Sequence, residues 1–395
     1  MVSIMFKNVK IDTKEAEALK EIEEIINGSF KVVDNVWAKT EMGIKVSNAH
    51  IIELGLYEKE ISMLPESIGN LKHLNVLSMD RCSLRKLSES IGNLRALKEI
   101  SFFKNQLKSV PDSIGNLREL KRLNLSYNSL SVLPNSLEDL SSLESLKLRG
   151  NKFIRIPEII GKMKSVNSLS FDGNPIIEIP DFLVDLPNLS GLYLENCKLK
   201  SIPESIGYIA HPNTLDLMYN ELINLPESIG SLYTLGHLEL SHNKLTELPV
   251  SIGNLTNLRS LQLDHNLLTS LPDSIGNLVA LKTLYLQHNK LKSLPDTIGN
   301  LINLESLYIN NNNLIAVPDS LGNLSELKGL QLGNNRLTTL PNSLIGLNII
   351  PSLEANNFTS VPPVLEELYK KIMGREPKNY FKKDKTFGYE PPSSK

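Results

Sequence analysis

Three histidines recur at intervals of 23 residues and are the set in this sequence most suggestive of chemistry. His242, His265 and His288 each follow a predicted short strand, and the acidic residues Glu239 and Asp264 stand close to them. Imidazole nitrogens and carboxylate oxygens hold divalent ions such as Zn²⁺, and histidine also titrates near neutral pH. If successive strands stack about 4.8 Å apart, the three rings form a candidate metal site or a pH-sensitive patch. The simpler interpretation is that duplication copied one filling of a repeated slot. The sequence favours this interpretation, so we assign no metal site.

No other set of residues points to catalysis. The sequence contains no GxxxxGK[ST], HExxH, GxSxG or CxxC motif, and no segment outside the repeats is long enough for a separate catalytic domain. The two cysteines, Cys82 and Cys197, lie five repeats apart. At strand spacing this is about 24 Å, which is too far for a disulfide. We therefore expect a protein that is not an enzyme and uses no cofactor.

Charge and hydropathy argue against several classes of protein. The 42 basic and 44 acidic residues leave a net charge of −2, and acidic residues outnumber basic ones within residues 48–368. Nucleic-acid binding would need a basic stripe that this body lacks. No apolar run approaches the roughly 18 residues of a membrane span, and the first apolar run is too short for a secretory signal. The sequence predicts a cytoplasmic protein with no membrane insertion and no nucleic-acid partner.

The histidines, acidic residues and cysteines named above belong to a 23-residue repeat. The first of thirteen full repeats begins at Asn48 and the last at Leu324, with a new repeat every 23 residues. A final repeat near Leu347 is two residues short. Apolar residues occupy positions 1, 4, 7, 9, 14, 17 and 21, with Asn at 12, Pro at 18 and Gly at 22. Positions 7 and 9 alternate as in a short buried strand. We expect stacked parallel strands, a buried Asn that satisfies backbone groups, Pro as the first residue of a helical turn, and Gly in the turn back to the next strand.

The pattern LxxLxLxxNxLxxLP resembles the leucine-rich repeat family, and the ending LPxSIGNL is similar to its intracellular 23-residue class, including the Ras-group scaffolds. The resemblance covers about 80% of the chain. It implies an α/β solenoid, a right-handed horseshoe with a parallel sheet on the concave face and short helical turns on the convex face. The family accepts Cys in place of Asn at position 12, where Cys82 and Cys197 fall. By analogy, the resemblance suggests a small GTPase or a phosphatase as partner.

We place the partner-binding surface on the concave face, because positions 6, 8, 10 and 11 have no structural duty in the pattern. Basic residues gather in the early repeats and acidic residues, including Asp172, in later ones, while exposed aromatics on a rigid sheet are typical of interface hot spots. The residues assigned to this surface are Tyr57, Phe103, Lys104, Arg122, Tyr127, Lys147, Arg149, Tyr193, Glu195, Asp216, Met218, Tyr219, Glu239, Asp264, Tyr285 and Tyr308.

These features predict a non-enzymatic scaffold that binds a protein partner in intracellular signalling. One alternative is the sensor subunit of a signalling enzyme carried on a separate chain. Another is an adhesion protein, which would need an export signal. The sequence makes no prediction of the oligomeric state.

The two ends of the chain are expected to cover the apolar faces of the terminal repeats. Residues 1–47 are interpreted as an N-terminal helical cap, with a helix over 12–27 capped by Asp12 and supported by Val32, Val33 and Trp37. Residues 48–368 form the solenoid, with thirteen full repeats and one shortened repeat. Residues 369–395 contain the end of a C-terminal cap helix, which runs from Val364 to Met373, and a basic tail that we expect to be mobile.

Overall fold

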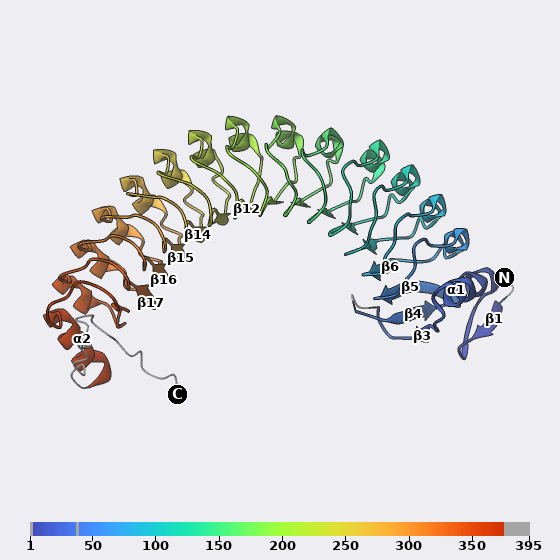
Figure 1. The fold of residues 1–395 in the computed structure, drawn as a ribbon, viewed down its shortest axis with the longest axis horizontal. Helices are drawn as coiled ribbons and strands as arrows, with labels where there is room; N and C mark the ends of the chain where they lie inside the picture. Colours follow the sequence, from blue (N-terminus) through green and yellow to red (C-terminus); the bar gives the residue numbers. More distant parts are fainter. Residues whose placement is uncertain (1–2, 37–38, 375–395) are drawn as a thin grey trace. The chain divides into compact units, whose positions relative to one another are not determined.

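The structure, a computed structural model, describes residues 3–36 and 39–374, and the chain divides into two compact units (Figure 1). We call Met1–Cys197 the N-terminal unit and Lys198–Lys395 the C-terminal unit. Both units are built from the 23-residue repeat. Each full repeat contributes a short strand and a five-residue 3-10 helix, with the strands on one side of the unit and the helices on the other. Each unit is therefore a repeat solenoid.

The elements before the first repeat are richer in strands than predicted. The helix lies where the sequence places it, and the Asp12 carboxylate caps it by accepting from Lys14 N at 2.9 Å and Glu15 N at 3.4 Å. The strands that precede the first repeat were not predicted, and Trp37 lies outside the described residues. Strands β1 and β2 form an antiparallel hairpin, and β4 pairs antiparallel with β5. The bounds are β1 (Ser3–Phe6), β2 (Val9–Asp12), α1 (Thr13–Ile26), β3 (Lys31–Val32), β4 (Met42–Ser47) and β5 (His50–Tyr57).

From β5 onward the strands follow the repeat and are parallel. Neighbouring strands pair without a register shift, so that Leu123, Leu146 and Leu169 lie opposite one another, and all three are buried. The predicted parallel sheet is confirmed. The N-terminal unit contains β6 (Val76–Asp80), β7 (Glu99–Ser101), β8 (Arg122–Asn124), β9 (Ser145–Lys147), β10 (Ser168–Ser170) and β11 (Gly191–Tyr193). The C-terminal unit contains β12 (Thr214–Asp216), β13 (His237–Glu239), β14 (Ser260–Gln262), β15 (Thr283–Tyr285), β16 (Ser306–Tyr308) and β17 (Gly329–Gln331).

A buried asparagine at position 12 ties most repeats to the one before. Asn266 accepts from Leu245 N at 3.0 Å and donates to Leu240 O at 2.9 Å, both in the preceding repeat. It also donates to Leu263 O in its own repeat at 3.0 Å. The predicted role of this residue is confirmed. The same three bonds are made by Asn128, Asn151, Asn174, Asn243, Asn289, Asn312 and Asn335.

The two cysteines occupy the same slot and reach the same carbonyls of the preceding repeat. Cys82 Sγ lies 3.4 Å from Leu56 O, and Cys197 Sγ lies 3.6 Å from Phe171 O. Both thiols are buried and unbridged, and burial raises the pKa of the Cys82 thiol to about 11. The reactive nucleophile is the thiolate, so the raised pKa disfavours reaction at Cys82. Their role is structural.

The helical turns opposite the strands are 3-10 helices whose proline and glycine act differently from the prediction. Pro272 is the extended residue that precedes its helix, with φ −68° and ψ 150°, and is not the first helical residue. Gly276 has no positive φ. Instead, a Cβ at Gly276 would meet the backbone oxygen of Thr297 at 2.3 Å, so glycine allows adjacent helices to pack closely.

These helices repeat in both units. The N-terminal unit has η1 (Glu66–Asn70), η2 (Glu89–Asn93), η3 (Asp112–Asn116), η4 (Asn135–Asp139), η5 (Glu158–Lys162) and η6 (Asp181–Asp185). The C-terminal unit has η7 (Glu204–Tyr208), η8 (Glu227–Ser231), η9 (Val250–Asn254), η10 (Asp273–Asn277), η11 (Asp296–Asn300), η12 (Asp319–Asn323) and η13 (Asn342–Gly346).

The described chain ends in α2 (Pro363–Met373), which packs against η13 and agrees with the predicted helix. Val364, Leu365 and Leu368 are buried, and Gly374 ends the helix in the left-handed conformation. The basic tail predicted to be mobile lies outside the described residues. Within residues 3–36 and 39–374, no helix has the length and apolar character that a membrane span needs. The domain boundaries at residues 47 and 368 stay predictions.

Candidate functional site

Side chains at positions 6, 8, 10 and 11 form the outward surface of the strands, which we call the strand face. Position 11 has a backbone requirement that the sequence analysis did not recognise. In His242, His265 and His288 φ is 57°, 54° and 56°, in the left-handed region that favours Gly, Asn and His. The expectation that this position has no structural duty was therefore wrong. The same conformation occurs at Glu58, Arg81, Lys104, Tyr127, Gly150, Gly173, Asn196, Tyr219, Asn311 and Asn334.

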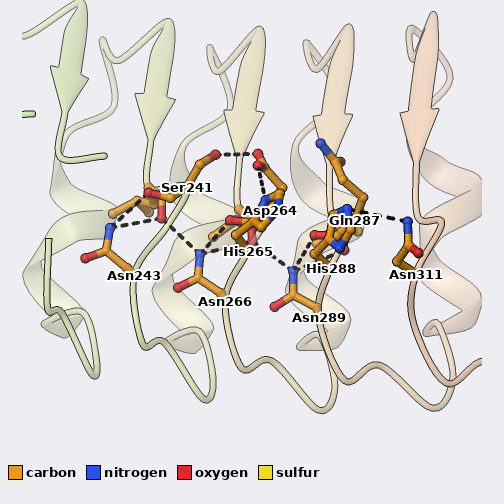
Figure 2. Close-up of polar contacts among 12 residues, drawn as sticks. Ser241, Asn243, Asp264, His265, Asn266, Gln287, His288, Asn289 and Asn311 are labelled. Atoms are coloured by element: carbon orange, nitrogen blue, oxygen red, sulfur yellow. Dashed lines mark hydrogen bonds and ion pairs between the residues drawn. The ribbon is translucent and has the colours of Figure 1, made fainter. Parts of the chain in front are cut away.

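Four successive repeats of the C-terminal unit stack their position-11 rings into a column. The ring centroids of Tyr219 and His242 are 4.2 Å apart, those of His242 and His265 4.0 Å, and those of His265 and His288 4.2 Å. The angles between neighbouring ring planes are 9°, 14° and 23°. Asn311 lies 3.5 Å from His288 Nε2 at the next repeat (Figure 2). The predicted alignment of the three histidines is therefore present.

Asp264 is the acidic residue that contacts this column. Its Oδ2 lies 2.9 Å from His265 Nδ1, and its Oδ1 accepts the hydroxyl of Ser241 (Figure 2). One potential ligand atom from each of His242, Asp264 and His265 lies within 4.8 Å of the others. Burial, followed by the charge of His265, lowers the pKa values of His242 and His288. A lowered pKa favours the neutral form of an imidazole, which is the form that binds metals.

Two of the acidic residues predicted for the concave face, Asp172 and Asp216, have structural roles. Asp172 and Asp216 are 7% and 8% exposed. Asp172 accepts from Glu195 N at 2.9 Å, and Asp216 accepts from Met218 N at 3.1 Å. Because they cap backbone amides, these two carboxylates offer little surface to a partner. Glu239, by contrast, is half-buried on the strand face.

Two of the four basic residues assigned to the partner-binding surface, Arg122 and Arg149, are paired with acids within the N-terminal unit. Arg122 forms an ion pair with Glu99, a position-6 residue that the sequence analysis passed over. Arg149 lies 3.2 Å from Glu195. Lys104 and Lys147 are exposed and make no ion pair within the described part of the chain. Glu99 has the 23-residue spacing from Arg122 that places two side chains on adjacent strands, so the signal was present in the sequence.

A cavity opens on the strand face of the N-terminal unit beside this zone. Its volume is about 240 Å³, and it is lined by the strand residues Glu99, Arg122 and Lys147 and by Val36 from the segment before β4. The Val36 backbone N–H donates to Glu53 Oε2 at 2.8 Å. Sequence reasoning missed Val36, because no repeat position predicts that this segment lies over the strands.

The aromatic residues assigned to the strand face form local clusters. Tyr285 and Tyr308 stack with centroids 4.9 Å apart and planes 3° apart. Phe103 contacts the edge of Tyr127 at 5.2 Å, and Arg149 lies 5.9 Å from the Tyr127 ring centroid. Other assigned residues also lie on this face: Tyr57 with Arg81 over its ring at 5.7 Å, Tyr193, whose ring lies close to Gly191, and the half-buried Met218.

Comparisons with known proteins agree with this repeat architecture. A family model described as leucine-rich repeat region matches residues 46–126 and 250–332, and a second, described as leucine rich repeat, matches residues 103–153 and 213–268. A leucine-rich repeat protein of Leptospira interrogans is similar, with 30% identity, a TM-score of 0.72, and 95% of this chain and 99% of that chain covered. A comparison with curated protein sequences gave no match.

Two plant receptors with bound peptide hormones are also similar. The plant peptide hormone receptor RGFR1 in complex with RGF2 has 28% identity and a TM-score of 0.61, with 80% of this chain and 61% of that chain covered. The Arabidopsis receptor kinase HAESA, in complex with the peptide hormone IDA and the co-receptor SERK1, has 28% identity and a TM-score of 0.66. That match covers 88% of this chain and 60% of the receptor chain.

Proposed function

Since the chain belongs to the leucine-rich repeat family, we propose that it is a non-enzymatic binding protein whose strand face, the predicted concave face, holds a protein or peptide partner. Leucine-rich repeat proteins generally mediate protein–protein interactions. The observation that carries the proposal is the pair of stacked ring rows in the C-terminal unit, Tyr219 to His288 and Tyr285 with Tyr308. Rings fixed by stacking lose little conformational entropy when a partner covers them.

The charge of the C-terminal unit indicates the kind of partner. Its strand face carries the acids Asp216, Glu239 and Asp264, whereas positions 6, 8, 10 and 11 of its repeats hold no Lys or Arg. Complementary charge steers a partner and fixes its orientation. We propose that the bound segment is basic and lies across the rings. Glu239 is the acid best placed to attract it, because Asp216 is largely buried.

A second candidate is the recognition part of a signalling enzyme whose catalytic domain is on another chain. It is favoured by the similarity to HAESA, a receptor kinase solved with a peptide hormone. The same similarity favours a peptide as partner. The small GTPase or phosphatase partner and the intracellular Ras-group class stay predictions that rest on resemblance. The cytoplasmic location stays a prediction from hydropathy.

The proposal is tested by selecting binding peptides from a random display library with the full chain and measuring their affinities by calorimetry. We expect the selected peptides to be basic and to compete for one site. Tyr219→Ala and Tyr308→Ala should each lower the affinity at least about fivefold, equivalent to about 1 kcal/mol. Glu239→Lys should slow association.

The matched control is Asp273→Ala, which changes a residue of η10 on the opposite side of the repeat. It should leave peptide affinity unchanged. Peptides that tolerate both tyrosine substitutions but fail on Asp273→Ala would overturn the assignment of the strand face. Isolation of a kinase with the chain from its native cell would support the second candidate.

A further inference from the structure

We propose that His242, Asp264 and His265 form a zinc-binding site on the strand face of the C-terminal unit. The three residues come from two adjacent repeats and offer two imidazole nitrogens and one carboxylate oxygen within 4.8 Å of one another. Zn²⁺ takes this kind of ligand set, and sites with three protein ligands keep a fourth position open. That position would hold water or a side chain of a partner.

The local surroundings of Asp264 distinguish it from the two aspartates at position 10 of the N-terminal unit. Asp80 and Asp172 each accept a backbone N–H of the following repeat, from Phe103 and Glu195. The Asp264 carboxylate instead meets only side chains within the described residues, the Ser241 hydroxyl and His265 Nδ1. It is therefore anchored by one oxygen and directs the other at the imidazole column.

The left-handed backbone explains why histidine is acceptable at position 11, but it does not explain this carboxylate. In the C-terminal unit, the position-10 residues of the other repeats are Met218, Ser241, Gln287, Asn310 and Gly333. Among these repeats, only the one with His265 at position 11 has an acid at position 10. His265 is the middle ring of the three stacked histidines. This coincidence favours a ligand set over duplication of a neutral filling.

Zinc binding requires a modest rearrangement of side chains. Ligand atoms of a tetrahedral zinc ion with bonds of about 2.0–2.1 Å lie about 3.3 Å apart. The 2.9 Å between Asp264 Oδ2 and His265 Nδ1 must open by a few tenths of an ångström. The His242 ring is now nearly parallel to that of His265, at 14°, so it must turn to direct a nitrogen at the ion. The His265 ring is exposed and the His242 ring is half-buried.

The donor set selects the class of ion and determines the proton balance. Two imidazoles and one carboxylate suit borderline ions such as Zn²⁺, whereas Ca²⁺ and Mg²⁺ prefer oxygen ligands. The ion replaces the proton between His265 Nδ1 and Asp264 Oδ2. A neutral His265 moves that proton to Nε2, whereas an imidazolium releases one proton to solvent.

The test is calorimetric titration of the metal-free full chain with zinc chloride at pH 7.5. We expect one ion per chain, with His242→Asn, His265→Asn and Asp264→Asn each weakening binding at least about tenfold. Asparagine is the proper replacement for the histidines, because Asn311 and Asn334 adopt the same left-handed conformation at position 11. Circular dichroism confirms that each variant is folded.

Two controls separate this site from adventitious binding. His237→Asn, at position 6 of the repeat that contains His242, should bind zinc like the unchanged chain. Imidazole NMR of the unchanged chain, which needs no variant, should show zinc shifting the signals of His242 and His265 but not of His237. His50 and His73 form another pair of neighbouring rings, with centroids 3.8 Å apart. Absence of a one-ion transition, unchanged affinity in all three site variants, or shifts confined to this pair would each overturn the proposal.

Discussion

Replacing Asn266 by alanine should destabilise the C-terminal unit through one orphaned backbone group. The asparagine makes three bonds, to Leu245 N, Leu240 O and Leu263 O. The two carbonyls keep a second amide donor, since Asn243 Nδ2 also donates to Leu240 O and Asn289 Nδ2 to Leu263 O. The Leu245 N–H has no other hydrogen-bond partner in the described chain.

The expected loss is therefore that of one buried N–H, about 1–3 kcal/mol of unfolding free energy. Repeats with cysteine at position 12 show how the chain relaxes. Ile176 N, which lacks an asparagine partner, donates to Asn174 O at 2.8 Å within its own repeat. If the Leu245 N–H turns in the same way to Asn243 O, the loss of unfolding free energy is about 1 kcal/mol. If it does not turn, the loss is about 3 kcal/mol.

Urea unfolding compares Asn266→Ala with Gln262→Ala, a half-buried strand-face residue whose side chain has no hydrogen bond within the described residues. Because repeat proteins unfold in more than one step, amide hydrogen exchange at Leu245 gives a local second readout. Asn266→Ala should lower the unfolding midpoint and the protection of Leu245, and Gln262→Ala should change neither. Equal effects at both positions would refute the role assigned to the buried asparagine.

Gly253→Ala should destabilise the chain by about 1–3 kcal/mol in urea unfolding, because its Cβ would lie 2.4 Å from a backbone oxygen of the next repeat. Gly329→Ala, with no atom closer than 3.8 Å, should not. Hydrogen bonds from Lys328 and then Lys282 lower the pKa of Glu305 to about 2, so carboxyl NMR should show it ionised until the pH falls toward 2, and Lys328→Met should raise that midpoint. Any stabilisation from these pairs is present above the ordinary pKa and lost as the pH falls through the lowered one. Deleting residues 1–47 exposes Ile51 and Leu54, which are fully buried, so light scattering should show aggregation, and a soluble, cooperatively folding truncation would contradict the cap.

The repeat register was predictable because every repeat solves the same packing problem. Apolar residues at fixed positions identify the strand, and the single asparagine identifies where the chain leaves it. Thirteen copies average out the ambiguity that a single short strand would have. The hairpin β1–β2 and the strands β3 and β4 have no such copies, so nothing in the sequence distinguished them from the rest of the cap.

The candidate site was predictable in its positions but not in its contacts. The 23-residue spacing places His242, His265 and His288 in one row, as the structure shows. Spacing does not predict that Asp264 turns one oxygen toward His265, or that Asp172 and Asp216 are occupied by backbone amides. These outcomes depend on side-chain torsions, which the spacing of residues does not specify.

The sequence by itself determined the repeating strand, the hydrogen-bonding role of the asparagine at position 12, the placement of both cysteines at that position, and the alignment of side chains on one face. Each depends on contacts that recur with the period and so leave a pattern in the residue types. Only the tertiary structure decided three other features. It showed why glycine and proline recur at positions 22 and 18, which backbone angle favours histidine at position 11, and which charges are already paired. Glycine packing and charge pairing depend on distances of a few ångströms between neighbouring repeats, and the preference at position 11 depends on a backbone torsion. Residue type alone does not encode these quantities.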